Sequence, residues 1–374
     1  MGRRPVWAEI DLGAVRDNTR VLTNLVAPAR VCAVVKAFGY GHGPVRVAEA
    51  ALSGGATWLA VATVEEGVQL RQGGITEPVL LLSEPPPPAM GDVVSWQLTP
   101  TLYTQEGVEA AAKAITMLGG TGPLAVHLKV DTGMHRVGAT SDEAFQLASA
   151  VARAPELELE GFCTHLAVAD EPHNSFTAQQ VERFNEVVAR LAAAGVRPTL
   201  LHASNSAGAL TQPAARYDLV RCGLAVYGLA PSPELADHCR DLEPAMTLKA
   251  RVTYVKQVPA GDRISYGLRY RFERESTVAT VPIGYADGVP RRLADQGGEV
   301  LIGGRRRPIA GSVTMDQLMV DCGDDDGVVV GDEVVLLGRQ GPESIGAWEW
   351  ADLLDTIAYE VTCGISARVP RVYV

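Results

Sequence analysis

A single lysine near the start of the chain stands between an apolar run and a glycine-rich turn. Lys36 follows the apolar, β-branched residues 31–35. The turn behind it alternates glycines with two polar rings, in the order Gly39, Tyr40, Gly41, His42 and Gly43. A buried strand that ends in such a turn brings backbone close to a small ligand in α/β proteins. A lysine there is partly desolvated, so its amine can be neutral and nucleophilic.

A lone lysine at a strand end more often simply reaches solvent, so the reactive interpretation depends on the other polar residues of the chain. Polar groups end several further apolar runs: Lys129, Arg136, His165, the segment 202–206 and Arg221. With Lys36, the site would contain four positively charged side chains, namely Lys36, Lys129, Arg136 and Arg221. The ligand of such a site should therefore carry negative charge.

Loops that follow the last two strands of a barrel commonly hold a phosphate group with backbone N–H groups. Ser206 and the turn Gly223-Leu224 are suited to this, and Tyr40 can donate a hydroxyl. A nucleophilic lysine beside a phosphate site indicates a phosphorylated aldehyde held as a Schiff base, which is pyridoxal 5'-phosphate. A sugar-phosphate aldolase would use the same groups, and residue patterning alone does not separate the two.

The elements that must position these residues alternate in type along the first 240 residues. Strand-like runs fall at 31–36, 58–62, 79–82, 97–101, 124–130, 159–165, 199–203 and 219–222. Helical patterns fall at 12–25, 44–52, 64–72, 106–117, 142–153 and 175–194. This order predicts a (β/α)8 TIM-like barrel with its chemistry at the carboxyl ends of the strands. The run 97–101 is weakly strand-like, and a doubly wound sheet is the alternative.

The pattern changes near residue 240, where strand-like runs separated by Gly- and Asp-bearing turns replace the alternation. The runs are 248–255, 276–283, 299–302, 317–320 and 332–337, with one short helix at 345–356. The sequence therefore predicts an α/β chain with two domains. They are an N-terminal barrel over 1–240 and a mostly β C-terminal domain over 241–374, which residues 1–11 join as a strand.

Composition excludes several classes of protein. The 374 residues carry a net charge of −11, which argues against nucleic acid as a partner because phosphate binding needs a basic face. No apolar run is long enough for a membrane span, and the first residues do not form a signal peptide. Six scattered cysteines indicate a reducing cytoplasm, and histidines without nearby Cys or carboxylate partners predict no metal site.

Residues 34–43, Val-Val-Lys-Ala-Phe-Gly-Tyr-Gly-His-Gly, resemble the cofactor-lysine signature of the bacterial alanine racemases. Similar segments run through the whole chain, at 7–12, 129–138, 205–206, 221–228, 264–267, 283–288, 315–317 and 368–371. The resemblance implies a pyridoxal-phosphate enzyme that racemises L-alanine to D-alanine, a peptidoglycan precursor, in the cytoplasm. It thereby favours pyridoxal phosphate over the aldolase alternative.

The resemblance also assigns the two catalytic groups. Lys36 is similar to the lysine that binds the cofactor covalently and then acts at one face of Cα. Tyr266 is similar to the acid–base group at the opposite face, and racemisation needs one group on each side. A free phenol has a pKa of about 10, so Tyr266 needs nearby positive charge or hydrogen bonds to act as a base. In the family, His165 and Arg221 provide it.

Further roles follow from the resemblance alone. Arg221 would face the pyridine nitrogen, Arg136 would contact the substrate carboxylate, and Lys129 matches a position that is carbamylated in many members. The remaining cofactor contacts would be Tyr40, His165, Asn205, Ser206, Gly223, Leu224 and Tyr359.

The resemblance also implies a homodimer with shared active sites. Tyr266 and the substrate-binding residues Met315 and Asp316 would act in the site of the partner subunit. Asp170, Tyr285, Arg291 and Tyr359 match residues of the substrate access channel. The expected partners are therefore a second copy of the chain and a small amino acid.

Three positions depart from the family pattern. Phe38-Gly39 replaces the usual Asn or Asp followed by Ala, Thr314 stands where Cys is frequent, and Ser312 stands where the channel commonly has an arginine. A neutral channel would admit serine or larger amino acids, so a broader amino-acid racemase is one alternative. A decarboxylase of the same architecture is another, but it would use a cysteine where this chain has Thr314.

Overall fold

The computed structural model describes residues 4–120 and 122–374. The chain divides into two compact units. We call Gly13–Gly39 with Pro44–Glu243 the barrel unit. The remainder is the β unit, which contains the residues up to Leu12, Tyr40–Gly43 and Pro244–Val374. Within the described residues, no helix has the length and apolar character needed to cross a membrane.

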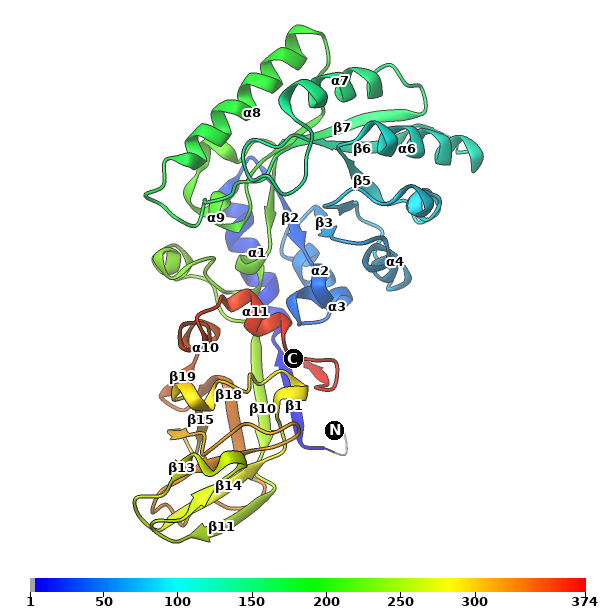
Figure 1. Cartoon of the computed structure of the whole chain (residues 1–374). Coiled ribbons are helices and arrows are strands. Elements are labelled where there is room, and N and C mark those ends of the chain that lie inside the picture. The colour runs from blue at the N-terminus through cyan, green and yellow to red at the C-terminus, as the bar shows by residue number, and fades with distance from the viewer. Residues whose placement is uncertain (1–3, 121) are drawn as a thin grey trace. The chain divides into compact units, whose positions relative to one another are not determined.

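Eight parallel strands form the core of the barrel unit (Figure 1). They are β2 (Arg30–Val34), β3 (Trp58–Val61), β4 (Val79–Leu81), β5 (Thr99–Leu102), β6 (Leu124–Lys129), β7 (Leu157–Cys163), β8 (Leu200–His202) and β9 (Leu219–Cys222). The strand order is β8-β7-β6-β5-β4-β3-β2-β9. The two ends of this order approach each other, since Asp218 N donates to Leu201 O at 3.0 Å. The nearly closed barrel confirms the predicted fold class. The weakly strand-like run 97–101 also contributes a strand, β5.

Amphipathic helices follow the strands because each has one apolar side to bury. They are α1 (Leu12–Val26), α3 (Pro44–Ser53), α4 (Val64–Gln72), α6 (Gln105–Met117), α7 (Ser141–Val151) and α8 (Phe176–Ala193). In α8, Phe184, Val187 and Leu191 recur at helical spacing and are buried. Threonines at 63, 104 and 140 cap the first turns of α4, α6 and α7. Sequence patterning missed the short helices α5 (Met90–Ser95) and α9 (Ser206–Thr211).

The β unit contains three separate sheets. The largest runs β16-β15-β18-β10-β1-β20 with β19 paired to β18, and the others are β11-β14-β17 and β12-β13. The bounds are β1 (Val6–Ile10), β10 (Met246–Arg251), β11 (Tyr254–Val258), β12 (Arg263–Ile264), β13 (Tyr270–Arg271), β14 (Ser276–Val281), β15 (Glu299–Ile302), β16 (Arg305–Pro308), β17 (Leu318–Asp321), β18 (Glu333–Gln340), β19 (Glu343–Ile345) and β20 (Arg371–Tyr373). Two helices, α10 (Ala347–Leu354) and α11 (Ala358–Cys363), follow β19.

One predicted strand of the β unit is wrong in its extent. The run 248–255 is divided between β10 and β11, which belong to different sheets. The chain bends between Arg251 and Tyr254, where Val252 N bonds Asp332 O and Thr253 N bonds Thr280 O. The alternation of Leu248, Ala250, Val252 and Tyr254 continues through the bend, so the pattern gave no sign of the break, although Tyr254 is exposed.

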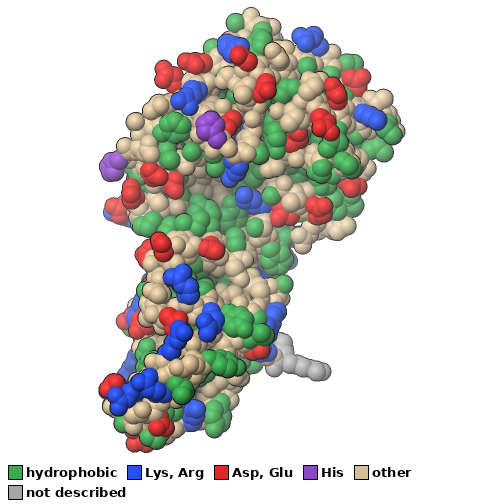
Figure 2. Space-filling model, viewed as in Figure 1, with side chains coloured by type: hydrophobic (Ala, Val, Ile, Leu, Met, Phe, Trp, Pro, Cys, Tyr) green, Lys and Arg blue, Asp and Glu red, His purple; other side chains and the backbone are tan. Residues whose placement is uncertain are grey.

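Acidic and basic side chains are intermixed over the barrel unit on the face shown in Figure 2. This distribution accords with the acidic net charge of the chain. A phosphate-binding surface for nucleic acid instead gathers basic residues on one face.

Candidate active site

Lys36 begins a left-handed turn at the mouth of the barrel. The sequence predicted a strand through Lys36, but β2 ends at Val34. The four residues after the lysine all have positive φ, namely Ala37 (+53°), Phe38 (+56°), Gly39 (+62°) and Tyr40 (+51°). This conformation costs roughly 1–2 kcal/mol for each residue other than glycine. The turn therefore requires contacts from outside itself.

Glu66, at the start of α4, supplies one of those contacts. Its carboxylate accepts hydrogen bonds from Ala37 N at 2.6 Å and from Ala62 N at 2.8 Å. The same side chain completes a capping box with Thr63. One carboxylate thus joins the residue after the lysine to the end of the next strand. The Thr-x-x-Glu spacing predicts the helix start, but nothing in it indicates the bond to Ala37.

Arg221 is a buried cation at the carboxyl end of β9. Its Nη2 donates to the carbonyl oxygens of Thr164 at 2.8 Å and Ala203 at 3.0 Å, and Nη1 bonds His202 Nδ1 at 2.6 Å. Burial lowers the pKa of Arg221, but arginine remains charged at neutral pH because its pKa begins so high. Nη2 is committed to these bonds, whereas Nη1 uses only one of its two N–H groups on His202. The second N–H group of Nη1 and the Nε–H group are then the candidate donors for a ligand.

His165 lies beside Arg221, and this contact determines which of its nitrogens carries a proton. Arg221 Nη2 lies 3.2 Å from His165 Nδ1. Because a guanidinium can only donate, Nδ1 accepts and the proton of a neutral imidazole is on Nε2. Burial, followed by the charge of Arg221, lowers the pKa of His165 well below its usual value. The imidazole is therefore neutral at pH 7 and offers an N–H group.

Gln180 of α8 holds the loops that follow β6 and β7. It is fully buried. Its Nε2 donates to the hydroxyl of Thr132 at 3.2 Å and the carbonyl of His165 at 3.1 Å, and its Oε1 accepts from Ala167 N at 2.8 Å. We did not predict this residue, because a glutamine within an amphipathic helix resembles an ordinary surface residue.

Lys129 ends β6 and is 7% exposed. Burial lowers its pKa to about 8, and the charges of Arg221 and Arg136 act in the same direction. A substantial fraction of this amine is therefore neutral near physiological pH. Arg136 is exposed on the following loop, where the carboxylate of Asp131 accepts from Gly133 N at 2.8 Å.

The residues predicted to hold a phosphate fall into two groups. In the barrel unit, Ser206 Oγ accepts from Gly223 N at 2.9 Å and Ala225 N at 3.4 Å, so the Gly223-Leu224 turn lies against the serine. In the β unit, the rings of Tyr40 and Tyr359 have centroids 6.1 Å apart.

Asn205 has a structural role that the sequence did not predict. Its Oδ1 accepts from Gly208 N at 3.0 Å and caps α9. Its Nδ2 lies 3.5 Å from Leu166 O. The same sequence segment therefore carries both a cap and a candidate phosphate ligand.

Tyr266 lies on an exposed turn of the β unit, with 72% of its surface accessible. Two serines join this turn to the segment that precedes Met315. Ser265 Oγ donates to Ser312 O at 2.9 Å, and Ser312 Oγ donates to Tyr266 O at 3.3 Å. Ser312 is only 3% exposed. Its hydroxyl thus faces the interior of the β unit, which argues against the interpretation of this serine as a neutral channel residue.

The other candidates of the β unit lie around neighbouring turns. Tyr285 N donates to Thr314 O at 3.0 Å, which places the turn of Tyr285 beside the Met315-Asp316 segment. Asp316 forms an ion pair of 2.6 Å with Arg368, and Arg368 lies 3.4 Å from the buried carboxylate of Asp287. Arg291 follows the same turn. Asp170, in the barrel unit, accepts from Ser232 Oγ through its carbonyl.

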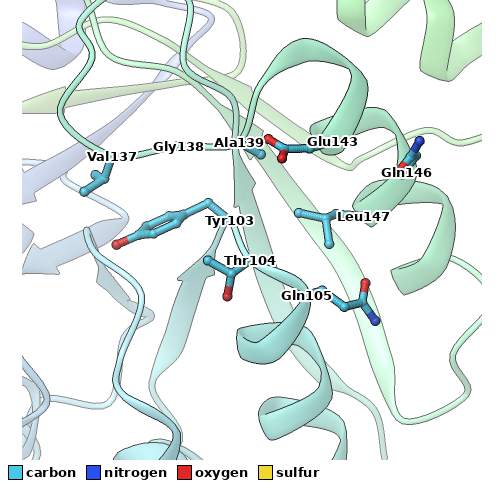
Figure 3. A pocket seen from close by; sticks show the side chains of 9 residues that line it. All are labelled: Tyr103, Thr104, Gln105, Val137, Gly138, Ala139, Glu143, Gln146 and Leu147. Atoms are coloured by element: carbon cyan, nitrogen blue, oxygen red, sulfur yellow. The ribbon is translucent and has the colours of Figure 1, made fainter.

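A pocket of about 470 Å³ lies between the end of β5 and the start of α7. Figure 3 shows Thr104 and Gln105 on one side of it and Glu143, Gln146 and Leu147 on the other. Val137 and Gly138, which follow Arg136, also line it. None of the predicted site residues lines this pocket, and its walls offer no charge suited to an anion.

Fold and site together define an α/β-barrel enzyme with a lysine at the end of its first barrel strand and a separate β domain. Comparison with known proteins agrees. Residues 10–231 match the family model "Alanine racemase, N-terminal domain" and residues 245–373 match "Alanine racemase, C-terminal domain". The chain belongs to the alanine racemase family and is an isomerase that acts on amino acids.

Individual relatives cover the whole chain. The alanine racemase of Symbiobacterium thermophilum is 52% identical over 100% of this chain and 98% of its own length. That of Carboxydothermus hydrogenoformans is 46% identical over 99% of this chain and all of its own. The crystal structure of alanine racemase from D-cycloserine-producing Streptomyces lavendulae matches with a TM-score of 0.94 and 40% identity, covering 100% of this chain and 98% of that one.

A bound ligand appears in the name of another similar structure. Alanine racemase from Bacillus anthracis with bound L-Ala-P has a TM-score of 0.93 and 41% identity, covering 100% of this chain and 96% of that one. Membership in the family contradicts the decarboxylase alternative.

Replacing Glu66 should loosen the turn behind Lys36. We expect Glu66→Gln to lower the free energy of unfolding by about 1–2 kcal/mol, because charge-assisted hydrogen bonds to Ala37 and Ala62 become neutral ones. Chemical denaturation measures the loss. Hydrogen exchange of the segment 35–40 should also become faster. Glu186→Gln, an exposed change on α8, is the control, and equal effects of the two variants would contradict the assignment.

Proposed function

We propose that the chain interconverts L- and D-alanine by a two-base mechanism that uses Lys36 and Tyr266, with pyridoxal 5'-phosphate as cofactor. The observation that carries the proposal is the contact between the buried Arg221 and the half-buried His165 at the end of the barrel that also bears Lys36. The family membership fits the same reaction. The separate β unit with its exposed Tyr266 provides the second base.

The residues of the barrel unit fit this cofactor. Lys36 is half-buried at a strand end and supplies the amine for covalent attachment. Arg221 would offer one of its remaining N–H groups to the pyridine nitrogen. Ser206 and the Gly223-Leu224 turn would hold the phosphate, and Asn205 would support Ser206 from the neighbouring position. When bound, pyridoxal phosphate withdraws electrons from the Cα–H bond of the amino acid.

The two bases act on opposite faces of Cα. Lys36 removes or returns the proton on one face, and Tyr266 does so on the other. His165 supports Tyr266, because its Nε2–H group is free to donate to a phenolate while Arg221 occupies Nδ1. Because His165 is neutral, it stabilises the phenolate by a hydrogen bond without protonating it. Arg136 binds the carboxylate of the substrate, and Met315 and Asp316 limit its side chain.

Arg221 shapes the outcome of the reaction through its charge. Its guanidinium holds its proton at neutral pH and cannot readily transfer it to the pyridine nitrogen. The negative charge that develops on deprotonation of Cα is then less delocalised into the ring. This should disfavour transamination relative to racemisation.

Tyr266→Phe tests the second base. We expect kcat for racemisation to fall by about 10²–10⁴, the usual contribution of one acid–base group, while the absorbance of the Lys36-bound cofactor persists. Rates are measured with L-alanine, L-serine and L-lysine, so that the same assay determines the substrate range. Tyr254→Phe, which changes another exposed tyrosine of the β unit, should leave the rate unchanged. Wild-type activity in Tyr266→Phe would refute the two-base assignment.

Homodimerisation is the second part of the proposal. Tyr266, Leu268 and Met315 are each more than half exposed, and Tyr285 is 42% exposed, although all four are large and partly or wholly apolar. Clusters of exposed apolar side chains usually mark interaction surfaces. We infer that this surface covers the barrel mouth of a second copy, where Asp170, Tyr285, Arg291 and Tyr359 would line the access channel.

Mixing two inactive variants tests the shared site. Lys36→Ala and Tyr266→Phe subunits, exchanged at equal amounts, should form heterodimers in half of the molecules. Each heterodimer has one site with both bases, so we expect about a quarter of wild-type activity. Either homodimer alone serves as the control. Activity that stays at the level of the separate variants would show that Lys36 and Tyr266 act within one chain.

Lys129 is proposed to be carbamylated, giving an anion that holds Arg136. Carbamate formation requires a neutral amine, and a pKa of about 8 provides one. We expect ¹³C NMR with ¹³CO₂ to show a carbamate signal that grows from about pH 6 to pH 8 at constant dissolved CO₂, as the amine loses its proton. Lys129→Met should abolish the signal, whereas Lys113→Met, on the surface of α6, should retain it. A signal that survives in Lys129→Met would disprove this site.

A further inference from the structure

A line of buried side chains extends from Arg221 through the interior of the barrel. Arg221 Nη1 lies 2.6 Å from His202 Nδ1, and His202 Nε2 lies 2.8 Å from His127 Nδ1. His127 Nε2 in turn lies 3.5 Å from Glu160 Oε2, an ionic contact without a hydrogen bond, and among the described residues it has no hydrogen-bond partner. Both imidazoles are 0% exposed. The four residues come from four different strands, β9, β8, β6 and β7.

The interior of the barrel leaves space for the imidazole ring of His127. The Cβ of any residue other than glycine at position 161 would overlap the ring of His127. Trp58 packs against it with ring centroids 5.3 Å apart. His127 lies two residues before Lys129 on β6, so both side chains lie on the same face of the strand. The imidazole therefore occupies the layer directly below the proposed site.

Arg221 at one end and the charge of Glu160 at the other favour the same direction for the hydrogen bonds between them. A guanidinium has donors only, so His202 Nδ1 must accept and the proton of His202 is on Nε2. That proton is donated to His127 Nδ1, which places the proton of His127 on Nε2, facing the carboxylate of Glu160. Burial lowers the pKa of both histidines, in agreement with two neutral rings.

We infer that His202, His127 and Glu160 form a relay of positioning residues that fixes the orientation of Arg221. The inference rests on the proposed function, since Arg221 is the residue proposed to meet the pyridine nitrogen. A neutral, acceptor-bearing His202 holds Nη1 in one place, and the carboxylate at the far end keeps both rings in the tautomer this requires. Outer partners of this kind commonly change ligand affinity by about 10–100-fold when removed.

A matched pair of variants separates the relay from simple packing. Asparagine at position 127 keeps an acceptor near the position of Nδ1, whereas leucine has a similar size and no acceptor. We expect His127→Asn to bind pyridoxal 5'-phosphate within about threefold of the wild type. His127→Leu should weaken binding about tenfold or more. The measurement is a spectroscopic titration of the full-length apoprotein with pyridoxal 5'-phosphate.

Glu160→Gln tests the far end without altering the core. ¹⁵N NMR of labelled histidines in the apoprotein should show His202 protonated on Nε2 alone in the wild type. In Glu160→Gln and His127→Leu it should show a mixture of tautomers. Glu158→Gln, an exposed change on the same strand, is the control and should match the wild type.

The outcomes are distinct. Equal cofactor affinity in His127→Asn and His127→Leu, or an unchanged His202 tautomer in Glu160→Gln and His127→Leu, would overturn the relay. If His127→Leu does not fold, the tautomer in Glu160→Gln decides. A wild-type protein that binds no pyridoxal phosphate would instead overturn the proposed function, while the tautomers would still report on the relay.

Discussion

The barrel unit is arranged around one buried positive charge. A guanidinium removed from water is stable only when its N–H groups meet acceptors, and Arg221 finds them in two carbonyl oxygens and two imidazoles. Those acceptors come from the ends of β7 and β8 and the residues directly after them. The bonds of one side chain therefore connect the ends of these two strands and place the proton of His165 on Nε2. The site thereby contains the fixed positive charge of Arg221 beside a neutral His165.

Most of the fold could be predicted from apolar periodicity because its long elements bury a continuous face. All eight barrel strands lie where the apolar runs fall, and even the weak run at 97–101 forms β5. The errors have a common physical cause. Short elements such as α5 and α9 have six residues each, which is too short to show a helical period, and the bend between β10 and β11 lies within an uninterrupted apolar pattern.

The residues of the candidate site that supply a chemical group could be predicted from their type. The residues that hold neighbouring loops in place could not. Lys36 and His165 lie two residues after strands, Arg221 lies near the end of one, and all three carry groups that packing does not require. Glu66 and Gln180 resemble ordinary helix residues in the sequence, because their role depends on which loops the fold brings within reach of them. Ser312 is the opposite case, since its position in the sequence suggested a channel residue, whereas the bond from its hydroxyl to the backbone of Tyr266 became evident only in the structure.

The left-handed turn after Lys36 has a consequence for how the protein matures. Ala37 and Phe38 do not favour positive φ, so this segment has little tendency to adopt its final shape in an unfolded or half-folded chain. It becomes favourable once α4 is in place and Glu66 reaches Ala37. The conformation that fixes the position of Lys36 is therefore completed only in a chain whose neighbouring strand and helix have already assembled, so the covalent attachment site forms together with the barrel and not before it.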